Sequence, residues 1–87
     1  MELGRNERTG GYTAHFALDG QRYAADLSFT PDRGPECMVF RANKQFEVTD
    51  WHEVYACWFS TVTRDNLVLA VNDFLGERRY DGRYVQS

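Results

Sequence analysis

The stretch GYTAHFALDGQRYAADLSF, residues 11–29, decides the fold because two alternating segments flank a two-residue turn. Asp19-Gly20 is a pair that favours positive φ at both positions, as a tight hairpin turn requires. With this pair at the tip, Leu18 faces Gln21, and alternation and turn agree on one register. The apolar face of the predicted hairpin would belong to the core, and it consists of Tyr12, Ala14, Phe16, Leu18, Tyr23, Ala25 and Leu27.

A third strand is predicted over residues 36–42, ECMVFRA. Its two alternating sets of side chains are both largely apolar, which is typical of a central strand or of one covered on both sides. The preceding residues 30–35 contain two prolines and a glycine, so they predict a loop between the hairpin and this strand.

From Asp50 the hydrophobic period changes from that of a strand to that of a helix. Apolar side chains recur at positions i, i+3, i+4, i+7 and i+8 over residues 51–59, which predicts a helix. Asp50 can cap this helix, and Glu53 three residues later completes a capping box. A competing interpretation makes residues 54–62 a strand, because they are dense in aromatic and β-branched side chains.

A second helix is predicted by the same spacing in residues 67–75. Thr63 suits its N-cap and Gly76 suits the position just past its end. We therefore expect one α+β domain over residues 1–87. It would have an antiparallel sheet of about three strands, the N-terminal β-hairpin plus one strand, with two helices packed on one face. Its parts would be a flexible arm (1–10), a folded core (11–76) and a polar tail rich in Arg and Tyr (77–87).

The charge and the aromatic content of the chain argue against some classes of function and favour others. The 87 residues carry a formal net charge of −3, whereas a general nucleic-acid binder would carry a basic excess. Aromatic residues make up 15% of the chain, more than so small a core needs, so some are expected at an interface. No apolar run approaches the roughly 18 residues that span a bilayer, and residues 1–9 do not resemble a signal peptide.

The two cysteines, Cys37 and Cys57, both lie in apolar contexts. A small secreted scaffold usually carries four or more cysteines, so we expect both to be reduced, buried residues in a cytosolic protein. A single disulfide between them stays open as an alternative.

No set of residues predicts an enzyme. His15 lies on the polar face of the hairpin, diagonally near Asp26, which is typical of a surface ion pair. His52 is expected to be exposed, and no cluster of His, Cys or carboxylate residues has the spacing of a metal site. The sequence therefore predicts no catalytic, cofactor-binding or metal-binding residue, and no cofactor.

Two groups of residues are predicted to bind a partner. One combines acidic and aromatic side chains around the first predicted helix, and the other interleaves Arg and Tyr in the tail. Helix capping and solvated charge also explain the acidic group, and charge complementarity at a helix C-terminus also explains the tail. The predicted partner-binding residues are Glu47, Asp50, Trp51, Glu53, Tyr55, Trp58, Arg78, Arg79 and Tyr80.

Three segments, CMVF (37–40), EVTDW (47–51) and EVY (53–55), resemble a pattern in small uncharacterised proteins of bacterial viruses and mobile elements. In size, acidity and lack of a recognisable active site the chain is also similar to anti-CRISPR proteins, the compact inhibitors that such elements use against host defence. This resemblance implies a counter-defence inhibitor, and it assigns no role to any single residue.

The predicted function is that of a non-enzymatic protein that binds and inhibits a host protein or ribonucleoprotein complex in the host bacterial cytoplasm. Anti-CRISPR activity is its concrete form. One alternative is a nucleic-acid-binding accessory protein that uses the sheet and the Arg-Tyr tail. The other is a structural homodimeric phage protein. None of the three interpretations places the chain in a membrane.

Overall fold

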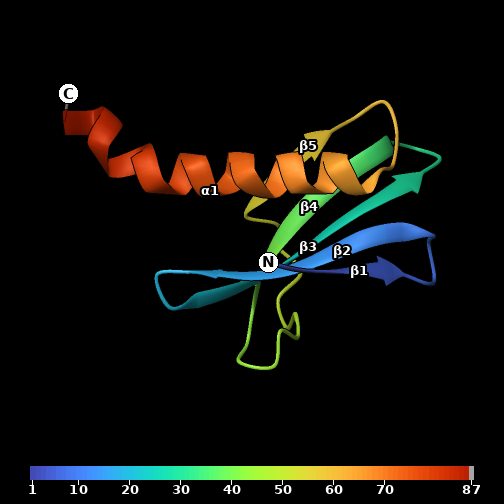
Figure 1. Cartoon of the computed structure of the whole chain (residues 1–87), viewed down its shortest axis with the longest axis horizontal. Helices are drawn as coiled ribbons and strands as arrows, with labels where there is room; N and C mark the ends of the chain where they lie inside the picture. Colours follow the sequence, from blue (N-terminus) through green and yellow to red (C-terminus); the bar gives the residue numbers. More distant parts are fainter. Residues whose placement is uncertain (87) are drawn as a thin grey trace.

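A computed structural model describes residues 1–86 of the chain, with side chains described for residues 1–78. It consists of one five-stranded antiparallel sheet and one helix that lies across one face of the sheet (Figure 1). The expectation of about three strands and two helices is therefore wrong. The elements are β1 (Glu2–Asn6), β2 (Gly11–Leu18), β3 (Gln21–Thr30), β4 (Gly34–Ala42), β5 (Tyr55–Trp58) and α1 (Arg64–Gln86).

The strands lie side by side in chain order, β1-β2-β3-β4-β5, and each neighbouring pair is antiparallel. The β2–β3 hairpin has the predicted register, with Leu18 opposite Gln21 and Tyr12 opposite Leu27. At its tip the φ angles of Asp19 and Gly20 are 52° and 82°, as the turn chemistry predicts. The predicted third strand is present as the core of β4, which pairs with β3 along its whole length.

The first predicted helix does not form. Its residues instead make part of the β4–β5 loop (residues 43–54) and the short edge strand β5. Tyr55 and Cys57 alternate toward the core while their backbone pairs with β4, so tertiary pairing overrides the helical spacing. The competing interpretation of a strand over residues 54–62 had the right element type at this place.

Both ends of the chain also differ from the expectation. Residues 2–6 are not a loose arm, because they form β1, which pairs with β2 and packs Leu3 against the core. Gly76 does not end the helix, since α1 runs on to Gln86 and includes most of the residues expected to form a tail. A glycine inside a helix costs about 1 kcal/mol relative to alanine, which a long helix tolerates.

Helix α1 begins where the sequence predicts. The Thr63 hydroxyl accepts a hydrogen bond from the Asn66 backbone N–H at 3.1 Å, as an N-cap does, and Asp65 lies in the first turn. Its buried stripe matches the predicted helical spacing and inserts four side chains into the core: Leu67, Ala70, Val71 and Phe74. The described part of the chain contains no helix with the length and apolar character needed to cross a membrane.

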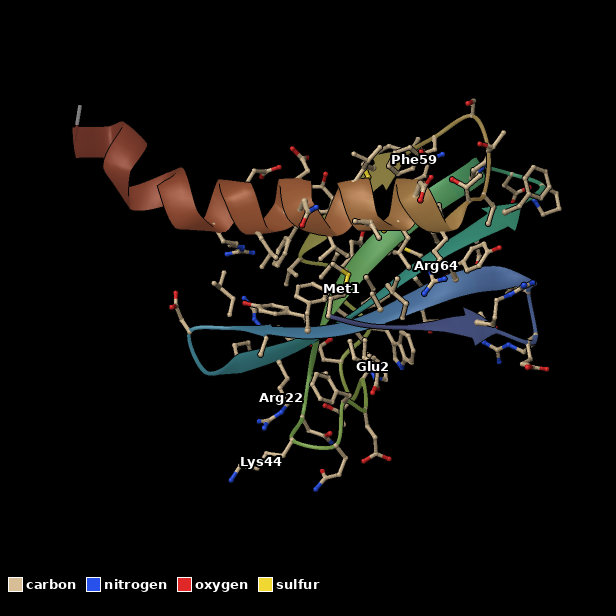
Figure 2. The ribbon with its side chains drawn as sticks, in the orientation of Figure 1. Met1, Glu2, Arg22, Lys44, Phe59 and Arg64 are labelled. Carbon is tan, nitrogen blue, oxygen red and sulfur yellow. The ribbon has the colours of Figure 1, made fainter. Side chains whose placement is uncertain are left out.

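We call the side of the sheet under α1 the helix face and the other side the open face. The helix face carries the core, where the rings of Phe16, Tyr23 and Tyr55 surround that of Phe74. The β4–β5 loop passes to the opposite side of the sheet from α1 (Figure 1). Arg22 and Lys44 also lie on that side, so the open face is partly roofed by a loop instead of a helix (Figure 2).

Candidate binding groove on the open face

The open face holds a groove of about 470 Å³ between the sheet and the β4–β5 loop. Side chains from β2, β3 and β4 form its floor, and the loop forms one wall. Aromatic and aliphatic groups make up most of the lining, as in typical ligand sites. The residues that line it are Asn6, Arg8, Thr9, Thr13, His15, Ala24, Ala25, Asp26, Ser28, Thr30, Met38, Phe40, Phe46, Val48 and Trp51.

Asn43 builds the turn that starts the loop. Its side-chain oxygen accepts hydrogen bonds from the backbone N–H groups of Gln45 (2.9 Å) and Glu47 (3.0 Å). Its own backbone N–H donates to the Glu47 carbonyl at 3.0 Å, and its carbonyl accepts from the Phe46 N–H at 2.9 Å. Asparagine suits such turns because its short amide can replace backbone partners. Residues 43–47 therefore form a closed, self-bonded turn.

This turn holds Phe46 against the sheet. Phe46 has a φ of 60°, a left-handed conformation that is rare and costly for a bulky residue other than glycine. Its ring stacks on the imidazole of His15 with centroids 4.9 Å apart and planes 6° apart. The guanidinium of Arg22 also lies over the Phe46 ring, 5.6 Å from its centre. The strained backbone of Phe46 is thus accompanied by contacts of its ring with His15 and Arg22.

Trp51 forms the far end of the same wall. Its ring packs edge to face on Phe40 of β4, with centroids 5.0 Å apart, while 69% of the residue stays exposed. Next to it the Asp50 carboxylate accepts hydrogen bonds from the backbone N–H of His52 (3.2 Å) and from its ring Nδ1 (2.7 Å). These bonds lower the pKa of Asp50 and raise the pKa of His52. Asp50 therefore stabilises a loop turn, and it does not cap a helix.

A chain of hydrogen bonds organises the polar end of the floor around Asp26. The Asn6 side-chain amide donates to one carboxylate oxygen at 2.7 Å, and the Ser28 hydroxyl donates to the other at 2.6 Å. Because the Ser28 proton is used there, the Thr9 hydroxyl donates to Ser28 at 2.7 Å and in turn accepts from the Gly11 N–H at 3.1 Å. The two side chains that donate these hydrogen bonds to Asp26, Asn6 and Ser28, are both neutral.

The structure separates the residues predicted to bind a partner. Trp51 lines the groove, whereas Trp58 lies on the edge strand β5 outside the groove and lines a separate hollow between β5 and α1. Tyr55 points to the helix face, where its hydroxyl donates a hydrogen bond to Asp73. Burial, followed by this hydrogen bond, raises the pKa of Tyr55. The three aromatic rings therefore do not form one surface.

The predicted acidic residues Glu47, Asp50 and Glu53 all lie exposed in the β4–β5 loop, beside the groove wall. Glu47 is also part of the Asn43 turn, because its carboxylate accepts from the Asn43 amide at 3.2 Å. Glu36 does not join them, since it is buried in β4 and pairs with Arg33 at 3.3 Å.

Of the predicted basic tail, Arg78 lies over the ring of Phe74, with its guanidinium carbon 5.2 Å from the ring centre. It therefore covers the end of the core on the helix face. The side chains of Arg79 and Tyr80 lie outside the described residues, so their predicted role stays a prediction.

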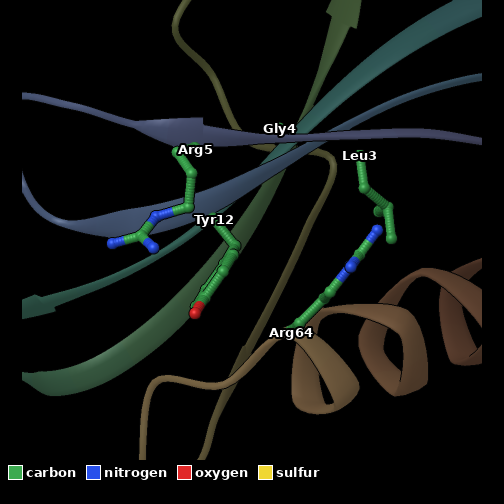
Figure 3. A pocket seen from close by; sticks show the side chains of 5 residues that line it. All are labelled: Leu3, Gly4, Arg5, Tyr12 and Arg64. Carbon is green, nitrogen blue, oxygen red and sulfur yellow. The ribbon is translucent and has the colours of Figure 1, made fainter.

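Two smaller hollows lie near the edges of the sheet. One, of about 210 Å³, lies between β1 and the start of α1, where Leu3 and Arg64 point toward one another (Figure 3). Arg5 in that hollow lies over the Tyr12 ring at 4.8 Å and donates to the Gly10 carbonyl. The other, of about 350 Å³, lies between β5 and α1 and is lined by Trp58 and Leu69 among others. Neither combines a fixed loop with an organised polar floor.

Sequence reasoning missed the centre of the groove. His15 and Asp26 were placed correctly on the polar face of the hairpin, and their position together was the available signal. Phe46 gave no usable signal, because nothing in the local pattern indicates a left-handed phenylalanine folded back on the sheet. Among the described residues, no three His, Cys, Asp or Glu side chains converge as metal ligands would.

Comparisons of this chain with protein-family models, with curated proteins and with solved structures find no match.

Proposed function

We propose that this protein is a non-enzymatic binding protein and that its groove receives a segment of a partner protein. The observation that carries the proposal is the prebuilt wall of the groove, where Phe46 is held over His15 despite its unfavourable backbone conformation. Strained residues that are fixed by their surroundings are concentrated at functional sites. Aromatic side chains in a groove are also the groups that dominate binding energy in protein interfaces.

A protein partner fits the charge of this surface better than a nucleic acid does. Asp26 lies in the floor, and Glu47, Asp50 and Glu53 lie in the loop beside it, whereas the basic side chains at the groove are separate: Arg8 lies in the lining and Arg22 over Phe46. Nucleic-acid sites need positive charge along the path of the phosphates. The aromatic rings alone are compatible with base stacking, so nucleic acid is the main alternative that an experiment must separate.

Inhibition of a host protein or ribonucleoprotein complex is the form of this function that the resemblance to anti-CRISPR proteins suggests. The bacterial cytoplasm is the matching compartment, because Cys37 and Cys57 are free thiols although they lie opposite each other in β4 and β5. The chain would act by occupying a surface that its target needs, with no chemistry of its own.

The proposal is tested by comparing two tryptophans. Trp51→Ala removes an exposed ring from the groove wall, and Trp58→Ala removes a similarly exposed ring (58%) from the edge strand β5, outside the groove. Tagged wild-type protein and both variants are used to capture partners from nuclease-treated bacterial lysate, with identification by mass spectrometry. We expect one stoichiometric protein that Trp51→Ala loses by at least about tenfold and Trp58→Ala retains.

Two results would contradict the proposal. Equal capture by both variants would place binding outside the groove. Loss of all capture after nuclease treatment would favour nucleic acid as the ligand. Circular dichroism of both variants must match that of the wild type, because the comparison requires that each remains folded.

A further inference from the structure

We infer that the groove recognises a basic side chain, the guanidinium or ammonium group of an arginine or lysine in the partner segment. The inference rests on the proposed function, since it names what the groove receives. Its basis is the Asp26 carboxylate, which forms no ion pair with a cationic side chain of residues 1–78 and lies in the floor of a groove lined by aromatic rings.

Asp26 is oriented but its charge is not neutralised. Each carboxylate oxygen accepts one hydrogen bond, from Asn6 or from Ser28, while an ionised carboxylate has about four acceptor positions. Among the residues with described side chains, no Lys, Arg or His forms an ion pair with Asp26. Two neutral donors therefore hold the carboxylate in a fixed direction and leave acceptor capacity for a ligand that brings positive charge.

The rest of the groove suits the stem and the head of such a side chain. Met38 and Ala24 from the floor, with Val48 from the loop, offer apolar surface for a chain of methylene groups. Phe40 and Trp51 meet edge to face at one wall, and cations favour the faces of such rings. A basic side chain combines an apolar stem with a charged head, and this groove presents both complements.

The charged side chains around the floor have both signs. Glu47 and Asp50 in the loop would attract a basic segment as it approaches. Arg8 in the lining would oppose it, as would Arg22 over the Phe46 ring and Lys44 in the loop. Arg8→Gln should therefore strengthen binding of a basic ligand by about twofold to threefold, the range of an exposed charge interaction.

The test uses three small probes: N-acetyl-arginine amide, N-acetyl-lysine amide and N-acetyl-citrulline amide. Citrulline keeps the shape of arginine but has no charge. The backbone amide signals of Thr13, His15 and Ala24 are followed by NMR during titration of the wild-type protein. We expect the arginine or lysine probe to shift these signals and the citrulline probe to bind at least about tenfold more weakly.

Two matched variants show whether Asp26 is the cause. Asp26→Asn keeps the size of the side chain and an acceptor for Ser28, and it should weaken binding of the basic probe by about tenfold or more. Asp19→Asn makes the same change of net charge at the hairpin tip, where asparagine tolerates the positive φ, and it should leave binding unchanged. Equal loss in both variants would overturn the inference, because it would show only general attraction.

Failure of the inference and failure of the proposed function give different results. If Asp26→Asn captures the partner as the wild type does while Trp51→Ala does not, the groove binds a partner but does not recognise a cation. If neither variant affects capture, both ideas are wrong. A shift of the groove signals by oligothymidylate, with none by the basic probes, would overturn the inference in favour of single-stranded nucleic acid.

Discussion

The helix face and the open face use alternate residues of the same strands, yet only the helix face is filled. On the helix face α1 covers the sheet and buries Leu27, Val39 and Phe74 almost completely. On the open face the β4–β5 loop covers only part of the sheet and leaves a groove with an organised polar floor. The helix face therefore supplies most of the stability, whereas the side chains of the open face lie outside the core and are available for binding. This division of roles can be tested one face at a time.

The largest effect on the free energy of unfolding is expected when a large side chain is removed from the core. Phe74→Ala removes the ring at the centre of the aromatic cluster and should lower the free energy of unfolding by about 3–5 kcal/mol, because lost burial and a new cavity add together. Thr13→Ala on the open face should change it by less than about 0.5 kcal/mol. Urea denaturation measures both. Similar losses in the two variants would show that the open face also holds the fold together.

The reactivity of the two cysteines also tests how well α1 closes the helix face. Burial, followed by the neighbouring Cys57, raises the pKa of the Cys37 thiol to about 12, so at pH 8 it forms about a thousandfold less thiolate than an ordinary cysteine. Cys57 is only partly buried at the sheet edge. Iodoacetamide at pH 8 should therefore alkylate Cys57 first and Cys37 only when the protein opens.

Peptide mass mapping after short reaction times distinguishes the two thiols. In urea both cysteines should react at similar rates, which is the internal control. Rapid alkylation of Cys37 in the native protein would mean that α1 leaves the sheet often, and the helix face would then be less closed than the structure shows.

A smaller effect is expected from loosening the roof of the open face. Asn43→Ala removes two bonds to backbone N–H groups and should lower the free energy of unfolding by about 1 kcal/mol. It should also release Phe46 from His15, which the NMR shifts of the His15 ring would report. Lys44→Ala, one position along the same turn, is the control. An unchanged His15 signal in Asn43→Ala would show that the stack forms without the turn.

The smallest expected effect is a shift in the titration of His52. Its hydrogen bond with Asp50 raises the pKa of the imidazole and lowers that of the carboxyl. The contact is therefore strongest between the two pKa values. It weakens as pH rises through the pKa of His52 and also as pH falls through the pKa of Asp50. NMR titration should give His52 a pKa above about 6.5 that returns toward this value in Asp50→Asn. The same pKa in both proteins would refute the contact.

The sequence predicted those parts of the fold whose local signals agree with their tertiary setting. The hairpin register and the start of α1 were correct because the Asp19-Gly20 turn and the Thr63 cap act through nearby backbone. The region from Asp50 to Trp58 was predicted wrongly, because its apolar residues fit helical spacing as well as a strand. Only pairing with β4 decides between them, and that is a contact distant in sequence.

The candidate site was harder to predict than the fold. Trp51 was correctly singled out as an exposed aromatic, but it was placed on a helix with Tyr55 and Trp58. The groove depends on a loop that folds back so that Phe46 meets His15, some 30 positions earlier in the chain. Such a meeting follows from the turn geometry of Asn43, which carries no hydrophobic period for a sequence pattern to detect.

The order of the strands also bears on how the chain folds as it is synthesised. Every strand of this meander pairs only with the strands before and after it in the chain, so the sheet can grow one hairpin at a time from its N-terminal end. The helix comes last, so the apolar helix face has no cover until residues 64–74 have been made. During that interval the nascent sheet exposes its core side, which is the period when aggregation competes with folding.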